Sequence, residues 1–300
     1  MHIPDNFLSP PVWATLDVVS AAGFGVIARH AGRHMEDSRI PLLGVMGAFV
    51  FAAQMINFPV GLGTSGHLVG GALMAYALGP SFAAVTMTAI LAVQAFVFQD
   101  GGVLALGANV FNMAIAGVLA AWLPYQLWGR GRMRKMAVFG GAFLSVMVSA
   151  TLALTELLIS GQRMPSSMLL LSIGLFAVSS LIEGLITVAV LQAIEGLNPS
   201  WVNRPERSPR GMLLALAGFA VLLAAAGFML ASTSPDGIEH IVGPTRSKFQ
   251  APLADYQLPF WSSNWGRRAV AGIIGLVLIF GLCALSGKLL SRRREAKCTT

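Results

Sequence analysis

The sequence predicts an all-α polytopic membrane protein, in which a bundle of seven helices is followed by a transmembrane hairpin of two more. Of the 300 residues, 55% are hydrophobic and only 11% are charged, and the mean hydropathy is +0.71. Soluble domains carry about 25% charged residues, so these polar groups are too few to cover a soluble surface. Apolar runs close to the ~20 residues that a spanning helix needs recur along the chain.

The net charge of +7 comes from short basic clusters that separate the apolar runs. This distribution is the positive-inside pattern of membrane proteins, so the expected partner is a lipid bilayer, with no nucleic acid. Cys283 and Cys298 lack the spacing of a metal-binding pair. A cleavable signal peptide is not expected, because the chain begins MHIPDNF rather than with a basic region and an apolar core.

The spans alternate across the membrane in an order set by the basic loops. The loop that ends at Arg39 is predicted to be cytoplasmic, which places the amino terminus outside. A Gly/Ser/Thr-rich outer loop is expected at 59–66, and the short segment 67–79 is expected to be tilted, broken or re-entrant. If the segment 67–79 is counted as a span, both basic loops lie on the same side of the membrane. The predicted spans are 10–28, 41–58, 67–79, 81–98, 103–123, 137–159 and 168–195.

A Pro- and Arg-rich stretch at 196–210 predicts a boundary between a first domain, 1–200, and a second, 201–300. The second domain is expected to contain two spans, an outer polar loop and a basic tail that anchors the carboxyl terminus in the cytoplasm. Its predicted parts are the span 211–231, the loop 232–266, the span 269–290 and the tail Arg292–Arg294. The expected location is the cell (inner) membrane, crossed many times.

The first two residues offer nitrogen ligands for a metal ion. The amine of Met1, the backbone nitrogen of His2 and the His2 imidazole can close a five-membered and then a six-membered chelate ring. Three nitrogens in a plane leave one position open, and such nitrogen-rich sites suit Ni(II) or Cu(II). His67 is the best candidate for the fourth nitrogen, because the topology puts it on the same outer side. The alternative, that His67 only caps a following helix, stays open.

Five polar residues are expected around these ligands. Ligating imidazoles usually need neighbouring acceptors that fix the tautomer. Asn109 and Asn112 share a helix face and could also hold the amino-terminal strand by its backbone. Ordinary hydrogen bonding between helices is the alternative. The five residues are Ser65, Gln94, Asp100, Asn109 and Asn112.

The remaining histidines are interpreted as structural. His30 and His34 are spaced i, i+4, but the arginines around them repel a cation. His240 lies in the predicted outer loop and is expected to be solvated, with a metal relay as the weaker alternative.

Three carboxylates, Glu156, Glu183 and Glu195, lie in or near apolar spans, where ionisable groups are functional candidates. Glu183 is the deepest and is expected to be hydrogen-bonded within the bundle.

Two motifs are missing from the sequence. The pattern H-E-x-x-H does not occur, which argues against a membrane zinc protease of that type. The pattern G-x-x-x-x-G-K-[ST] does not occur either, so the chain has no Walker-type ATP site of its own. A primary transporter built on this chain would need a separate ATPase.

Several of these stretches resemble one family in order along the chain. The segments Met1–Asp5, 63–71, 93–102 and 105–114 resemble the cobalt/nickel substrate-binding components of energy-coupling factor (ECF) transporters, called CbiM or NikM. The segment 183–187 also looks like a part of that family. Residues 211–290 resemble the two-span CbiN/NikN-type accessory subunit, with 235–239 similar to its PDGLE motif. The chain therefore resembles a fused protein of both kinds.

This resemblance implies a seven-helix ECF substrate-binding bundle whose amino terminus inserts from outside. It implies metal held by the Met1 amine, by the backbone and imidazole nitrogens of His2, and by His67. It also implies a transmembrane coupling (T) subunit and cytoplasmic ATPase subunits as partners, with no cofactor on the chain. Asn6 stands where a glycine is expected, and 178–180 lack a histidine that is associated with this region.

The expected function is the substrate-specificity component of an ATP-driven importer for Ni²⁺ or Co²⁺, not an enzyme. The nitrogen set and the Irving–Williams order favour Ni²⁺ over Co²⁺. The alternative is a self-sufficient secondary divalent-metal permease, which needs deep ionisable residues along a path; only Glu183 fits that role. A membrane enzyme would need a general base beside an open coordination position, and the planar site offers none.

Overall fold

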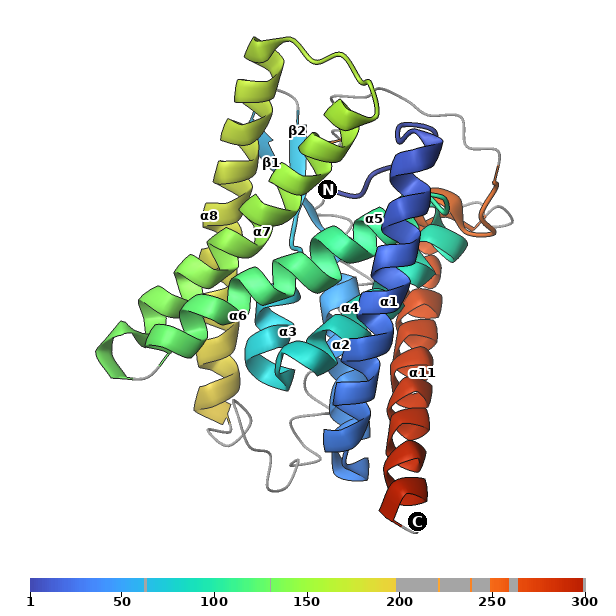
Figure 1. Cartoon of the computed structure of the whole chain (residues 1–300), viewed down its shortest axis with the longest axis vertical. Helices are drawn as coiled ribbons and strands as arrows, with labels where there is room; N and C mark the ends of the chain where they lie inside the picture. The colour runs from blue at the N-terminus through green and yellow to red at the C-terminus, as the bar shows by residue number, and fades with distance from the viewer. Residues whose placement is uncertain are drawn as a thin grey trace.

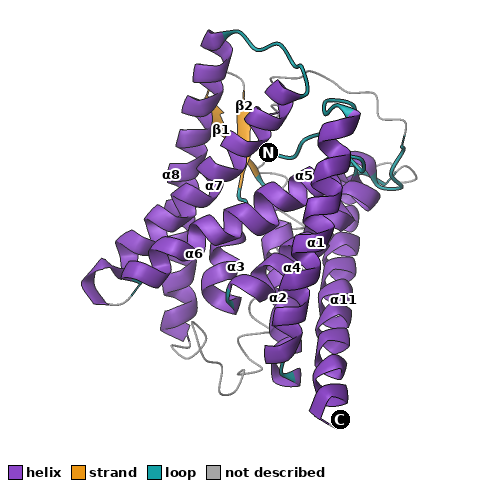
Figure 2. Cartoon of the chain, in the orientation of Figure 1, coloured by secondary structure: helices purple, strands orange, loops and turns teal. Residues whose placement is uncertain are grey.

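The computed structural model describes residues 1–61, 64–129, 131–197, 249–258 and 264–298, together with Val221 and Ile238. Within these residues the chain is helical apart from one two-stranded hairpin (Figure 1, Figure 2). Apart from those two single residues, the predicted span 211–231 and the turn 235–239 lie outside the described residues. The same holds for the boundary at 198–210 and for His240.

Six of the described helices are long and apolar enough to cross a bilayer. This finding agrees with the prediction of a helical, multi-pass membrane protein. The helices are α1 (Pro10–His34), α4 (Pro80–Val93) with its π-helical continuation η2 (Gln94–Phe98), the continuous run of α5 (Leu106–Asn109), η3 (Val110–Ala116) and α6 (Gly117–Trp128), then α7 (Arg134–Ile159), α8 (Ser166–Leu197) and α11 (Asn264–Cys298). Short 3₁₀ turns lie at Asp37–Arg39, Gly131–Met133 and Ala254–Tyr256.

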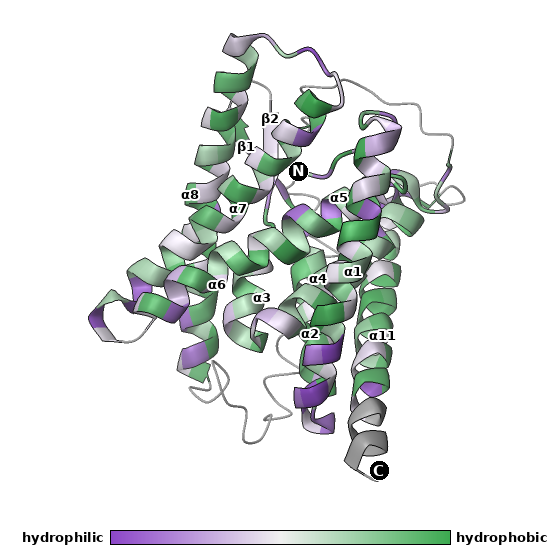
Figure 3. Ribbon diagram, viewed as in Figure 1, coloured by the Kyte–Doolittle hydropathy of each residue, from purple (hydrophilic) through white to green (hydrophobic). Residues whose placement is uncertain are grey.

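The outer helices turn apolar side chains away from the protein. Val18 on α1 is 71% exposed, and Leu170 and Leu185 on α8 are 70% and 63% exposed. Figure 3 shows hydrophobic residues along these helices. Lipid chains can cover such side chains at no cost, whereas water cannot, so the exposed apolar faces are those expected of membrane-spanning helices.

Two shorter helices lie inside the bundle. α2 (Ile40–Gln54) is buried along most of its length, and every residue of α3 (Gly71–Leu78) is buried. α11 packs against α2 through glycines: a Cβ on Gly44 would lie 2.7 Å from the ring of Phe280, and one on Gly47 would lie 2.9 Å from the Cys283 sulfur. Small residues let membrane helices approach closely, so the last helix of the chain packs directly against the first domain.

The predicted loop 59–66 is a β-hairpin, and the prediction of a helix as far as 58 is wrong. α2 ends at Gln54, and β1 (Asn57–Gly61) pairs antiparallel with β2 (Thr64–His67), with Asn57 opposite His67. Pro59 is incompatible with a helix interior. Backbone groups that enter the bundle must still be paired, and the hairpin pairs them.

The segment predicted at 67–79 is broken. Its helix, α3, has eight residues, which corresponds to about 12 Å against a hydrocarbon core of about 30 Å. Gly79, with φ 88°, ends the helix, and Pro80 begins α4. Hairpin and short helix together therefore replace one regular span, and this replacement brings His67 into the bundle.

Candidate metal-binding site

The amino-terminal arm, Met1–Asp5, is inserted among the helices at the upper end of the molecule (Figure 1). Met1 is 7% exposed, His2 3% and Ile3 0%. Burial of backbone polar groups is unfavourable unless they are hydrogen-bonded. The arm must therefore find donors and acceptors inside the protein.

Asn109 supplies both a hydrogen-bond donor and an acceptor to the backbone of Ile3. Its Oδ1 accepts a hydrogen bond from the Ile3 N–H at 2.8 Å, and its Nδ2 donates to the Ile3 carbonyl at 3.1 Å. The Gly102 N–H donates to the same carbonyl at 2.9 Å, and Asp5 Oδ1 accepts from the Leu104 N–H at 2.8 Å. The loop after η2 and the helix α5 thus hold the arm by its backbone. Of the two asparagines for which the sequence left this role open, Asn109 has it.

Glycines make the close approach of arm and loop feasible. Gly101 has φ 97°, and a Cβ there would lie 3.1 Å from the His2 Cβ. A Cβ on Gly102 would lie 2.5 Å from the Asp5 nitrogen. Only glycine satisfies both the positive φ at 101 and the lack of space at 102, so the Gly101-Gly102 pair determines how deeply the arm can enter.

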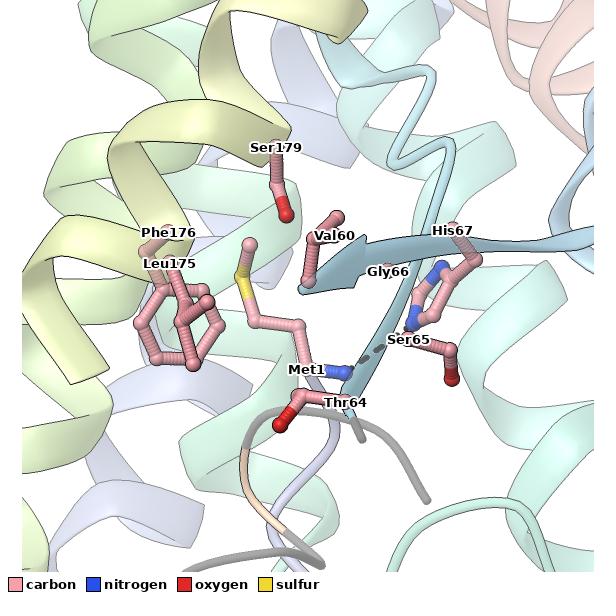
Figure 4. Close-up of a pocket in the computed structure, with 9 residues that line it drawn as sticks. All are labelled: Met1, Val60, Thr64, Ser65, Gly66, His67, Leu175, Phe176 and Ser179. Carbon is pink, nitrogen blue, oxygen red and sulfur yellow. Dashed lines mark hydrogen bonds between the residues drawn. The ribbon is translucent and has the colours of Figure 1, made fainter. Parts of the chain in front are cut away.

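The arm brings the Met1 amine next to His67. The amine nitrogen lies 3.0 Å from His67 Nε2 (Figure 4). His67 Nδ1 lies 3.0 Å from the Leu68 carbonyl, which can only accept, so the proton is on Nδ1 and the Nε2 lone pair faces the Met1 amine. Adjacent corners of a square of nitrogens around a metal at about 2.0 Å are about 2.8 Å apart. The observed separation fits neighbouring ligands in such a plane.

The His2 ring lies beside that of His67, with centroids 5.3 Å apart and planes at 9°. Its two nitrogens are buried. Asp100 Oδ1 lies 2.9 Å from His2 Nδ1. Nδ1, the nitrogen that can close a six-membered chelate ring with the His2 backbone nitrogen, therefore faces a carboxylate.

Asp100 is held as a carboxylate. Desolvation acts to raise its pKa, but the interactions with His2 and His67 and a hydrogen bond from Tyr256 outweigh this effect and hold the pKa below its usual range. Burial and the neighbouring Asp100 raise the pKa of Tyr256 well above normal, so its hydroxyl stays protonated and donates. A fixed negative charge therefore lies next to the two imidazoles, where a cation would be favoured.

The backbone that follows His67 is held by a carboxylate from α8. Glu183 accepts hydrogen bonds from the Val69 N–H at 2.8 Å and from the Gly70 N–H at 2.9 Å. Gln54 donates to the Val69 carbonyl at 2.7 Å. Gln54 ends the helix before the hairpin, whereas Glu183 lies more than 110 residues further along the chain, so the position of His67 depends on the assembled bundle.

A cavity of about 20 Å³ lies beside the Met1 amine. Figure 4 shows the Met1 side chain extending away from its amine towards Leu175 and Phe176 of α8. The predicted residue Ser65 is buried and lines the cavity. A volume of this size holds about one small particle such as a water molecule. The cavity touches Met1 and His67 but is not lined by His2.

Two other predicted residues lie away from the ligands. Asn112 donates to Glu156 at 2.8 Å, not to the arm. It shares a helix face with Asn109, but the π-helical stretch η3 begins between the two residues and turns them towards different partners. Gln94 donates to Gln54 at 2.9 Å, and reaches the His67 segment only through it.

Among the described residues no group of three or more His, Cys, Asp or Glu side chains could hold a metal. The candidate ligands are two imidazoles and two main-chain nitrogens, and such a set needs the end of the arm. His30 and His34, which were interpreted as structural, hydrogen-bond within their own helix, with His34 Nδ1 donating to the His30 carbonyl at 3.0 Å.

Glu183 is hydrogen-bonded within the bundle, as expected from the sequence, but its two N–H partners could not be found from periodicity. Sequence reasoning missed three other residues of this region. Gln54 and Tyr256 lie in stretches without a motif. Asp5 belongs to the conspicuous opening segment, but its role in binding the Leu104 N–H depends on how the arm docks.

Comparison with known proteins agrees with this architecture. Residues 2–201 match the family model CbiM, described as the cobalt uptake substrate-specific transmembrane region, and residues 210–292 match the PDGLE domain. The cobalt transport protein CbiM of Thermosediminibacter oceani is 35% identical over 207 residues, which cover 65% of this chain and 84% of that protein. The fused nickel transport protein NikMN of Rhodobacter capsulatus is 26% identical over 347 aligned positions, covering 99% of this chain and 100% of that one.

The fold is also that of a solved protein. A crystal structure of a transition metal transporter superposes with a TM-score of 0.54 at 24% identity and covers 66% of this chain and 94% of that one. Together with the family match and the multi-pass helical bundle, these findings lead to one assignment. The chain belongs to the CbiM family of metal transport components, with a PDGLE domain fused behind the CbiM region.

Proposed function

We propose that this protein is the substrate-specificity component of an ECF-type importer for Ni²⁺ or Co²⁺. The ion enters from the outer side and binds four nitrogens in a plane: the Met1 amine, the His2 backbone and imidazole nitrogens, and His67 Nε2. One observation carries the proposal, namely the 3.0 Å separation of the Met1 amine from His67 Nε2 beside the buried His2 ring. The relatives named as cobalt and nickel transport proteins support the choice of cargo.

The chemistry of the site follows from its donors. The ion takes the side of His2 Nδ1 that Asp100 now faces, and the carboxylate stays beside it to offset charge. Coordination through the His2 backbone nitrogen displaces its proton, so acid opposes binding by protonating the amine and both imidazoles. Nitrogen ligands in a plane favour Ni²⁺ over Co²⁺.

The energy for transport comes from other subunits in this proposal. The sequence has no Walker-type nucleotide motif, so a transmembrane coupling subunit and cytoplasmic ATPases supply it. The basic loops put the carboxyl terminus in the cytoplasm and the arm outside. A self-sufficient permease is disfavoured because Glu183, the candidate for a deep relay, already accepts two backbone hydrogen bonds.

The decisive test uses X-ray absorption on the purified full-length protein loaded with Ni²⁺ or Co²⁺. We expect one ion per chain with four nitrogen neighbours. H2A removes the imidazole that closes the six-membered chelate ring, so it should abolish this spectrum, while H34A should not. An unchanged spectrum in H2A would overturn the ligand set. Metal uptake that persists in cells without ATPase subunits would overturn the ECF assignment.

A further inference from the structure

The segment 249–258, from the part of the chain behind the CbiM region, lies against the metal-site end of the bundle (Figure 1). The Leu253 N–H donates to the Val97 carbonyl at 2.9 Å, and the Ala251 N–H donates to Gln99 Oε1 at 3.1 Å. The ring of Tyr256 stacks on Phe98 with centroids 4.6 Å apart and planes at 15°. These contacts fix the segment over η2 and the loop that follows it.

The Tyr256 hydroxyl reaches both segments that carry a histidine. It donates to Asp100 Oδ2 at 2.5 Å, and Asp100 Oδ1 lies 2.9 Å from His2 Nδ1. On its other side, Gln94 Nε2 lies 3.5 Å from the hydroxyl oxygen and donates to Gln54 at 2.9 Å. Gln54 in turn donates to the carbonyl of Val69, two residues after His67.

The backbone at this point is strained. Asp255 and Tyr256 both have φ 55°, in the left-handed region that residues other than glycine rarely adopt. Such conformations persist only where the surroundings determine them, and they cluster at functional sites. Contacts on three sides of Tyr256, with Phe98, Asp100 and Gln94, supply those surroundings.

We propose that Tyr256 is a positioning residue for the metal site, through which the fused second domain holds both histidine segments in binding geometry. The hydroxyl fixes the rotamer of Asp100, which orients the His2 ring before the ion arrives. When the ion takes Nδ1, the carboxylate stays beside it. Through Gln94 and Gln54, whose side-chain amides are hydrogen-bonded to each other, the hydroxyl is also connected to the backbone that follows His67. This inference rests on the proposed metal-binding function and assigns a role in it to the second domain.

The first test replaces only the hydroxyl, in the full-length protein. Y256F keeps the stacking on Phe98, and we expect it to weaken Ni²⁺ binding by roughly 3- to 10-fold, less than the ~10- to 100-fold cost of removing a residue directly behind a ligand. The X-ray absorption and visible spectra of the Ni²⁺-loaded variant should also change, which loss of packing alone would not cause. Y76F is the matched control, because among the described residues its buried hydroxyl donates to the Ala121 and Val138 carbonyls and to no group of the metal site.

The second test is a double-mutant cycle with D100N. The part of the effect that passes through Asp100 should be lost in the D100N background, so Y256F should weaken binding there by clearly less than it does in the wild type. Effects that multiply in full would overturn the relay. Wild-type affinity and spectra in Y256F would overturn the inference, provided that H67A abolishes binding. Unchanged binding in H67A would instead contradict the proposed metal-binding function. Failure of the inference about Tyr256 and failure of the proposed function therefore give different results.

Discussion

The His2–His67 pair and the His30–His34 pair consist of the same residues at similar distances. Ring centroids are 5.3 Å apart in the first and 4.7 Å apart in the second. The first pair joins segments 65 residues apart and is buried around His2, while the second lies on one exposed helix end. Proximity of two imidazoles is therefore a poor criterion for a metal site. The surroundings of the two rings decide whether a pair can bind a metal ion.

Those surroundings differ in charge and in rigidity. Beside His2 and His67 lie a carboxylate, an amine and backbone carbonyls, and both segments are held by side chains from other helices. Beside His30 and His34 the sequence places Arg29 and Arg33. Cations repel a metal ion, and an exposed helix end gives no fixed geometry. The predictions below test this contrast, beginning with the largest expected effect.

Removal of a ligand should have the largest effect. We expect H67A to weaken Ni²⁺ binding by more than about 100-fold, because even residues behind a ligand cost ~10- to 100-fold. Chelator competition on the purified protein measures the affinity. Wild-type affinity in this variant would show that His67 is not a metal ligand. The buried pair would then be structural, like the exposed pair.

Release of the arm should have the next largest effect. N109A leaves the buried Ile3 N–H without its acceptor, at a cost of about 2 kcal/mol, or roughly 30-fold in the equilibrium for docking the arm. Metal affinity should fall by a similar factor.

The matched control for the arm is N112A, one turn away on the same helix. Asn112 bonds Glu156 and not the arm, so its variant should lose stability in thermal unfolding but keep its metal affinity when folded. Equal losses of affinity in the two variants would contradict the assignment of the arm contact to Asn109.

Loosening of the segment after His67 should have a smaller effect. E183Q replaces a charge-assisted pair of hydrogen bonds to Val69 and Gly70 with weaker ones, at about 1 kcal/mol, or roughly fivefold in affinity. E156Q is the control, since Glu156 lies on α7 and contacts Asn112. Isothermal titration with Ni²⁺ distinguishes them, and a larger loss in E156Q would argue that the carboxylate roles are reversed.

The exposed pair should be dispensable. We expect the double variant H30A/H34A to bind metal within twofold of the wild type and to change stability by less than about 0.5 kcal/mol, as is usual for surface substitutions. Metal analysis after dialysis provides the measurement. The loss of one bound equivalent would show that the exposed pair is a second site.

Much of the site could be predicted from the sequence because its ligands lie in recognisable local patterns. Covalent geometry alone predicts that the opening residues can close chelate rings around an ion, and Gly101-Gly102 and Asn109 stand in two segments that resemble the CbiM family. The strand that carries His67 was predicted as a loop, because four- and five-residue strands between helices leave little periodic signal. The partners of Glu183 and Tyr256 could not be predicted, since they join residues more than 110 positions apart.

The sequence by itself determined the class of the protein, because hydropathy and the distribution of basic residues act locally and depend on no contact. It also determined that nitrogens at residues 1 and 2 can chelate one ion. Only the tertiary structure decided that the amine faces His67 Nε2, that Asp100 faces His2, and that the second domain contacts this pair through Tyr256. The reason is physical: buried polar groups take whatever partners the folded bundle brings within about 3 Å, and that choice belongs to the whole chain.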